Sequence, residues 1–177
     1  LSNMDTRSNG DRQRMLNTIL NSVFKVRIPI IRIPAVCAGG GAALWSANKL
    51  DYGCVLVVGV ERLVSNATEI TTNNIMMAAE RIYEQAEGLN FPAQNALVAQ
   101  SYMREYGATA NDLSLVALKN HNNAFYNPKA SFYKRQVTLK QIKKSPVICS
   151  PLRLFDCSLS VNGSAAAVLT KDKTDIE

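Results

Sequence analysis

Hydrophobic and polar positions in the first third of the chain predict one helix and two strands. Residues 11–24 place apolar side chains three or four positions apart, which is the spacing of an amphipathic helix. Residues 28–36 are rich in β-branched side chains but contain Pro29 and Pro34, so we expect an extended strand with edge or protected pairing. The continuous apolar run at residues 54–60 is typical of a strand buried on both faces. Such a strand predicts a layered α/β architecture.

The middle of the chain has helical spacing instead. Helices are expected at residues 76–86, 96–106, 111–126 and 138–144. Gly107 should stop the second of these helices, and Asn111 should cap the third. The last part returns to an apolar pattern, with core residues at 151–157, a turn at Asn162-Gly163 and a strand at 165–170.

The order of these patterns is core, helical insertion, core. We therefore expect one domain made of residues 1–64 and 147–177, with helices and mainly parallel strands. Residues 65–146 should form a largely helical insertion over the turn at Cys37.

Composition fits a globular protein and excludes several other classes. The chain has 177 residues, of which 47% are hydrophobic and 19% charged. The most apolar window, residues 26–45, contains Arg27, Arg32 and two prolines, so we expect no membrane span. No secretory leader is recognised, the four cysteines lack Cys-x-x-Cys spacing and there is a single histidine. We therefore predict reduced thiols, no metal site and a cytoplasmic protein, or a peroxisomal one in a eukaryote.

The net charge of +6 comes from one segment. Lys129–Lys144 holds six basic residues and no acidic one, and basic and acidic residues are equal in number elsewhere. This local excess predicts a local anionic partner, such as a phosphate-bearing cofactor, and no nucleic acid. The alternative interpretation is a solvated basic loop.

Cys37 carries the most chemical information. It lies where a predicted strand ends and Gly39–Gly41 begin a helix-forming run. A helix N-terminus favours the thiolate form of a thiol, and its free N–H groups can receive an oxyanion. The pattern therefore suits acyl transfer through a thioester, but from the spacing alone a small buried cysteine in a turn explains it at least as well. The glycines match neither the Gly-x-Gly-x-x-Gly nor the Walker pattern, which argues against a phosphate cradle.

The other candidate residues have weaker signals. Cys54, Cys149 and Cys157 are expected to be packing residues. His121 is interpreted either as a surface or capping histidine or as a residue of a substrate pocket. No Gly-x-Ser-x-Gly motif supports a serine hydrolase.

Four separated segments resemble, in order, the motifs of the thiolase family. They are residues 37–44 (CAGGGAAL), 57–62 (VVGVER), 119–132 (KNHNNA and NPKASF) and 151–166 (PLRLFDCS and NGSAA). The third is similar to a signature of the sterol-carrier-protein-type and archaeal thiolases. The resemblance implies an α/β fold, a layered βαβαβαββ half-domain with a mainly helical loop-domain insertion.

The resemblance also implies roles for individual residues. Cys37 would be acylated, and its backbone N–H would help to form an oxyanion hole. Phe91 would face the pantetheine arm or the acyl chain, and His121 would belong to the substrate pocket. Lys134 and Arg135 would contact the phosphates of coenzyme A. No permanent cofactor is implied, because coenzyme A thioesters are substrates.

The implied function is acyl transfer between coenzyme A thioesters, in either the condensing or the cleaving direction. The alternative is a non-catalytic thiolase-like scaffold subunit. A homodimer or tetramer is implied, with residues 28–36 paired across the dimer, as is a larger complex with other acyl-CoA enzymes. The chain is expected to hold only the first half of a thiolase, because the acid/base motifs of the second half are absent. Gly39 and Asn162 depart from the family's usual residues.

Overall fold

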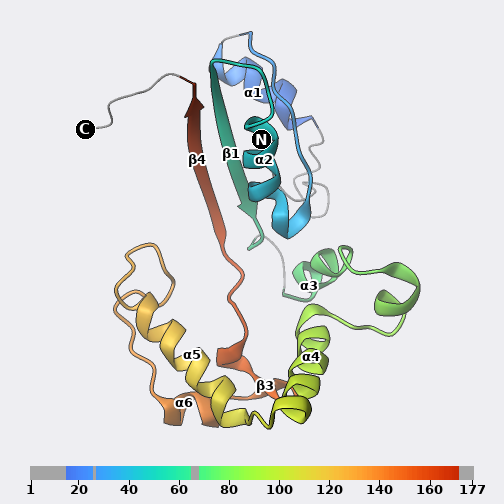
Figure 1. Ribbon diagram of the computed structural model, residues 1–177, viewed down its shortest axis with the longest axis vertical. Helices are drawn as coiled ribbons and strands as arrows, with labels where there is room; N and C mark the ends of the chain where they lie inside the picture. Colours follow the sequence, from blue (N-terminus) through green and yellow to red (C-terminus); the bar gives the residue numbers. More distant parts are fainter. Residues whose placement is uncertain (1–14, 26, 65–67, 172–177) are drawn as a thin grey trace. The chain divides into compact units, whose positions relative to one another are not determined.

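The computed structural model describes residues 15–25, 27–64 and 68–171 (Figure 1). The chain divides into two compact units. The first comprises Leu1–Asn74 with Ser160–Glu177, and the second comprises Ile75–Leu159. Helices and strands are mixed, which confirms the predicted α/β class. Within the described residues, no helix is long and apolar enough to cross a membrane.

The first unit is built on a two-stranded antiparallel sheet. Strand β1 (Cys54–Arg62) pairs with β4 (Asn162–Thr170), from Cys54 opposite Thr170 to Arg62 opposite Asn162. Helix α2 (Gly39–Ala47) packs along β1 (Figure 1). Its small side chains allow a close approach, and Ala43, Ala47 and Val57 form the buried core. Helix α1 (Leu16–Phe24) and the first part of α3 (Thr68–Met76) complete the unit.

The structure corrects several expectations in this unit. The segment at residues 28–36 is not a strand, because Pro29 and Pro34 lack the N–H groups that a ladder needs. Strand β1 is confirmed but is not buried on both faces, since only Val57 is buried in it. The expected parallel pairing is wrong for β1 and β4, and so is the expected turn at residues 162–163, which begin β4 instead.

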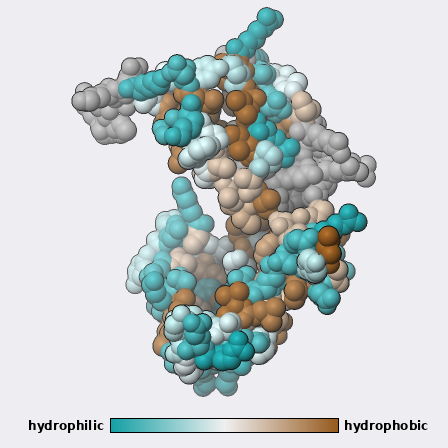
Figure 2. Space-filling view, turned by 45° about the vertical axis from the view of Figure 1, so that its right-hand side comes forward, coloured by the Kyte–Doolittle hydropathy of each residue, from teal (hydrophilic) through white to brown (hydrophobic). Residues whose placement is uncertain are grey.

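Helix α1 confirms the amphipathic pattern over the residues that the structure describes, while residues 11–14 of that prediction lie outside them. Large apolar side chains also reach the surface, which the hydropathy colours make visible (Figure 2). On the sheet these include Leu56, Val60 and Val168, with exposed fractions of 49%, 38% and 62%. The described sheet therefore leaves much of its apolar surface uncovered.

The second unit is mainly helical. Its long helices are α4 (Phe91–Tyr106) and α5 (Ala110–Ala124), followed by the short α6 (Leu139–Lys144). Gly107 ends α4 in a left-handed conformation, with φ of 69°, as its sequence position predicts. The unit also contains a π-helical turn at Arg81–Gln85, a hairpin of β2 (Val147–Cys149) with β3 (Leu152–Arg153), and a 3₁₀ turn at Leu154–Asp156.

Several helix boundaries in this unit differ from expectation. Helix α4 begins at Phe91 and not at residue 96, and α5 ends at Ala124 and not at residue 126. The helix predicted at residues 76–86 is instead the end of α3 followed by the separate π-helical turn. Helix α5 is capped by Thr109 and not by Asn111, because the N–H and the hydroxyl of Thr109 both donate to Asp112 Oδ2 at 2.7 Å in a capping-box arrangement. The expected short helix at residues 138–144 is confirmed by α6. The proposed domain limits at residues 64 and 146 stay a prediction.

Candidate functional site

Cys37 lies in a one-turn 3₁₀ helix, Val36–Ala38, that leads directly into α2. The Ala38 N–H donates to the Ala35 carbonyl at 2.9 Å, and the Gly39 N–H donates to the Val36 carbonyl. The Cys37 side chain is exposed, so the alternative of a small buried cysteine does not hold. The local sequence thus places an accessible thiol at the beginning of a helix.

The first turn of α2, which follows Cys37 in the chain, has open space at two of its glycines. A Cβ atom added at Gly40 or Gly41 would meet no atom within 4 Å, whereas Gly39 itself is buried. Gly40 and Gly41 therefore leave the surface of this turn open in the described part of the first unit. Chemically, an exposed thiol at a helix start can attack a carbonyl carbon and form a thioester.

The remaining thiols have different surroundings. Cys54 is exposed, so its expected packing role is wrong, while Cys149 and Cys157 are half-buried. Burial, the nearby charge of Asp156 and the thiol of Cys149 raise the pKa of Cys157. A raised pKa keeps Cys157 in the unreactive thiol form near neutral pH.

The His121 ring packs against two aromatic side chains of the second unit. Its Nε2 lies 3.0 Å from the Phe155 carbonyl oxygen, and its ring centroid lies 4.4 Å from that of Phe132 and 5.4 Å from that of Phe155. A carbonyl only accepts, so Nε2 carries the proton of this bond. The expectation of a surface or capping histidine is wrong, because the ring is half-buried and packed.

A cavity of about 320 Å³ adjoins His121. Helix α5 contributes Leu113, Val116, Ala117 and Asn120, and the other wall is formed by residues 155–158. Asp156 belongs to this wall. Its Oδ2 accepts the Arg153 N–H at 2.7 Å, while its Oδ1 is buried with no hydrogen-bond partner among the described residues. The pocket therefore combines an apolar helix face with a few polar groups.

Phe91 is the first residue of α4 and is half-buried. The Asn90 side chain accepts the Ala93 N–H at 3.1 Å and so caps this helix. The cap fixes the backbone that carries Phe91.

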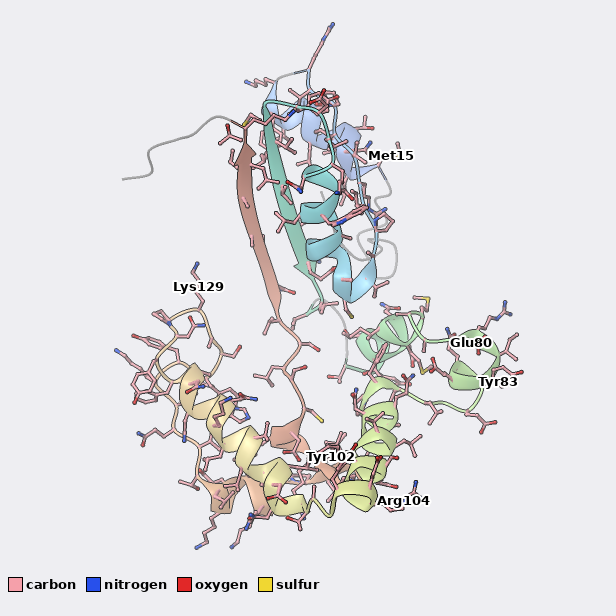
Figure 3. All side chains as sticks on the ribbon, in the orientation of Figure 1. Met15, Glu80, Tyr83, Tyr102, Arg104 and Lys129 are labelled. Atoms are coloured by element: carbon pink, nitrogen blue, oxygen red, sulfur yellow. The ribbon has the colours of Figure 1, made fainter. Side chains whose placement is uncertain are left out.

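The basic segment follows α5 and continues into α6. Lys134 has a left-handed backbone with φ of 55°, and its N–H donates to the Phe125 carbonyl at 3.0 Å. Its Nζ lies 5.1 Å from the ring centroid of Tyr133, and the Arg135 N–H donates to the Phe132 carbonyl at 3.0 Å. Both charged groups are exposed, as is Lys129, whose side chain extends away from its loop (Figure 3).

The five predicted site residues are divided between the units. Cys37 belongs to the first, and Phe91, His121, Lys134 and Arg135 belong to the second. Phe132 contacts both His121 and Arg135. Its ring packs against the His121 ring, and its carbonyl accepts the Arg135 N–H. Within the described ranges, no group of three or more His, Cys, Asp or Glu residues could hold a metal ion.

Sequence reasoning missed Val36, the residue before Cys37. Its φ is 46°, a left-handed value that a β-branched residue rarely adopts. No sequence signal marked it, because glycine and asparagine are the residues that usually announce this conformation.

The described geometry defines an α/β protein with an exposed cysteine at the start of a helix. Residues 1–151 match the model of the thiolase N-terminal domain, so the chain belongs to the thiolase family. The acetyl-CoA acetyltransferase of Methanothermobacter thermautotrophicus is 37% identical over 146 residues, covering 80% of this chain and 37% of that protein. Sterol carrier protein 2 of Bos taurus is 28% identical over 177 residues, covering 92% of this chain and 32% of that protein.

A solved structure with a similar fold is a chain of the Ltp2-ChsH2(DUF35) aldolase. It has a TM-score of 0.67 and 27% sequence identity, and the match covers 96% of this chain and 44% of that one. The benzoylsuccinyl-CoA thiolase subunit BbsB of Thauera aromatica is 29% identical over 150 residues, which are 82% of this chain and 38% of that protein. This chain thus spans a little over a third of the length of these thiolase relatives.

Proposed function

We propose that this chain supplies the nucleophile of a thiolase-type acyl-CoA acyltransferase. The observation that carries the proposal is the exposed Cys37 thiol at the start of α2, with open space beside Gly40 and Gly41. Membership of the thiolase family supports the same assignment.

In the first step the Cys37 thiolate attacks the carbonyl carbon of an acyl-CoA. A carbon–sulfur bond to Cys37 forms, the bond to the coenzyme A sulfur breaks, and coenzyme A leaves as its thiolate. The Ala38 and Gly39 N–H groups already bond within the turn, so we assign the oxyanion donor on this chain to the Cys37 N–H.

In the second step the carbanion of another acyl-CoA attacks the acylated Cys37. A carbon–carbon bond forms, the carbon–sulfur bond to Cys37 breaks, and the thiolate is regenerated. In the cleaving direction the thiol of coenzyme A takes the acyl group from Cys37. Both directions need a proton acceptor. His121 is engaged at Nε2 with the Phe155 carbonyl, so we assign this role to a residue outside this chain.

The second unit is proposed to hold the rest of the coenzyme A ester. Lys134 and Arg135 are exposed and lie in a segment without acidic residues, which suits contact with phosphates. Phe91 would face the pantetheine arm or acyl chain, and the pocket at His121 would belong to the same substrate region. The thiols are free, which fits a cytoplasmic protein, or a peroxisomal one in a eukaryote.

A non-catalytic scaffold subunit is the second candidate. Two relatives favour an assembly of several subunits: one is named as a subunit of benzoylsuccinyl-CoA thiolase and the other as part of the Ltp2-ChsH2(DUF35) aldolase. We propose a homodimer or tetramer, within a larger complex of acyl-CoA enzymes, for either candidate.

Covalent trapping separates the two candidates. The native protein is incubated with radiolabelled acetyl-CoA, quenched in acid and digested, and the labelled peptide is identified by mass spectrometry. We expect label on Cys37, loss of label in Cys37→Ser, and no loss in the matched variant Cys54→Ser, which changes another exposed thiol of the same unit. Label on another cysteine, or no label at all, would favour the scaffold.

A second experiment tests whether this chain suffices. The isolated 177-residue chain should neither condense acetyl-CoA nor cleave acetoacetyl-CoA, because it lacks the proposed proton acceptor. Turnover by the isolated chain that disappears with Cys37→Ala would show that the base lies within these residues.

A further inference from the structure

We propose that Val36 is a positioning residue whose left-handed backbone fixes the Cys37 thiol at the start of α2. The inference rests on the proposed role of Cys37. It begins from the value of φ at Val36, 46°, which is sterically costly for a side chain branched at Cβ. Such a conformation persists only where the surrounding structure imposes it.

The restraint comes from the backbone on both sides of Val36. The Ala38 N–H bonds to the Ala35 carbonyl at 2.9 Å and closes the turn across Val36 and Cys37. The Gly39 N–H bonds to the carbonyl of Val36 itself and joins the turn to α2. The Val36 side chain is 44% exposed, so packing of that side chain is a small part of the restraint.

The value of φ at Val36 sets the direction in which the chain enters the helix. With the other torsions of the turn unchanged, a rotation of φ at Val36 to the ordinary negative region would turn residues 27–35 relative to α2 and separate the Ala38 N–H from the Ala35 carbonyl. Cys37 lies inside that turn, so its side chain would leave the helix end together with the broken bond. Val36 thereby acts on the reaction through Cys37 without touching the substrate.

Two substitutions at this position separate conformation from side-chain chemistry. Glycine adopts positive φ at no steric cost, so Val36→Gly should keep the turn. Proline is locked near −65°, so Val36→Pro excludes the positive φ at this position. Val64→Gly is the matched control, because Val64 is an exposed valine of the same unit, at 54%, and is not among the residues with positive φ.

The test uses the native protein and two measurements that need no acyl-CoA. Hydrogen exchange reports on the Ala38 amide, and iodoacetamide labelling gives the rate at Cys37 relative to the rate at the exposed Cys54 of the same molecule. For Val36→Gly we expect Ala38 exchange at least as slow as in the wild type and a labelling ratio within about twofold of it. For Val36→Pro we expect faster Ala38 exchange and a ratio lowered about two- to fivefold, which is what a helix N-terminus is worth to an anion.

Each result decides the question. A Val36→Pro protein with unchanged exchange and an unchanged ratio overturns the proposal, as does a Val36→Gly protein that loses protection at Ala38. A Val64→Gly protein that speeds Ala38 exchange and lowers the labelling ratio as much as Val36→Pro does also overturns it. If Val36→Pro does not fold, the Val36→Gly result alone decides. Covalent trapping with acetyl-CoA is measured separately, so a Cys37 that is held by Val36 but never acylated would refute the proposed function and leave the positioning role standing.

Discussion

The two units are stabilised in different ways. The core of the second unit contains a large aliphatic side chain, Ile142, whose exposed fraction is 0%, and half-buried aromatic rings pack around it. The core of the first unit consists of Ala43, Ala47 and Val57, which are small. The first unit also contains an open apolar pocket of about 320 Å³, lined by residues of α1, α2 and β1 and by residues 28–33.

Hydrogen bonds follow the same division. In the second unit Arg153 donates from Nη1 to the Ser145 carbonyl at 2.7 Å, and capping boxes begin α5 and α6. In the described part of the first unit, no side chain of the N-cap residue accepts a backbone N–H of α1 or α2. The second unit is therefore specified by local contacts. The first, which carries Cys37, depends on small residues and one described strand pair for its order.

The largest expected effect concerns the core of the second unit. Ile142→Ala should lower the free energy of unfolding of that unit by about 2–5 kcal/mol, because the side chain is fully buried and its removal leaves a cavity. Chemical denaturation with hydrogen exchange on α5 and α6 measures it.

The same change at a surface isoleucine is the matched control. Ile148→Ala, at a side chain that is 48% exposed, should cost well below 1 kcal/mol. Both residues lie in the second unit, so equal losses from the two substitutions would show that burial of Ile142 adds nothing to the stability of that unit. Val57→Ala extends the comparison to the first unit, where we expect a smaller loss than for Ile142→Ala because less volume is removed beside an existing pocket.

A smaller effect is expected from the cap of α5. Thr109→Ala should destabilise the second unit by about 0.5–2 kcal/mol, since it removes one side of the capping box. Thr109→Ser retains a hydroxyl and should restore most of the loss. Thermal unfolding of the wild type, Thr109→Ser and Thr109→Ala should give midpoints that fall in this order. A Thr109→Ala protein as stable as the Thr109→Ser protein would mean that the hydroxyl of the cap contributes nothing.

The sequence predicted the elements whose signals are local. Gly107 correctly predicted the end of α4. The helix expected at residues 138–144 differs from α6 by one residue at its start. The apolar run at residues 54–60 gave β1. In each case the pattern and the chemistry of one short segment decide the structure.

What could not be predicted depends on partners distant in sequence or on rare conformations. The antiparallel pairing of β1 with β4 joins residues more than 90 positions apart along the chain. The segment at residues 28–36 has a strand composition, but in the described residues it has no neighbouring strand. At the site, the motif indicated Cys37, whereas the left-handed Val36 and the aromatic packing of His121 came only from the coordinates.

The smallest expected effect is a dependence on pH at the turn that begins with Glu80. Its carboxylate accepts the N–H groups of Ile82 at 2.9 Å and Tyr83 at 2.7 Å (Figure 3). These two bonds, with that of Ile82 first, lower the pKa of Glu80 below its ordinary value of 4.5. A lowered carboxyl pKa means that the folded turn favours the charged form, so its contribution is present above pH 4.5 and is lost as pH falls through the lowered value.

Exchange of the Ile82 and Tyr83 amides, corrected for the intrinsic pH dependence of exchange, should therefore become faster as the pH falls through the lowered pKa of Glu80. Glu80→Gln keeps an acceptor but cannot titrate there, so it should abolish most of this dependence. Glu84 must be followed as well, because its Oε2 accepts the Glu80 N–H at 2.7 Å. Glu80 is fully exposed, so the change should stay within this turn and leave the α5 and α6 amides unaffected. If the same pH dependence survives in Glu80→Gln, the turn is held by something other than this carboxylate.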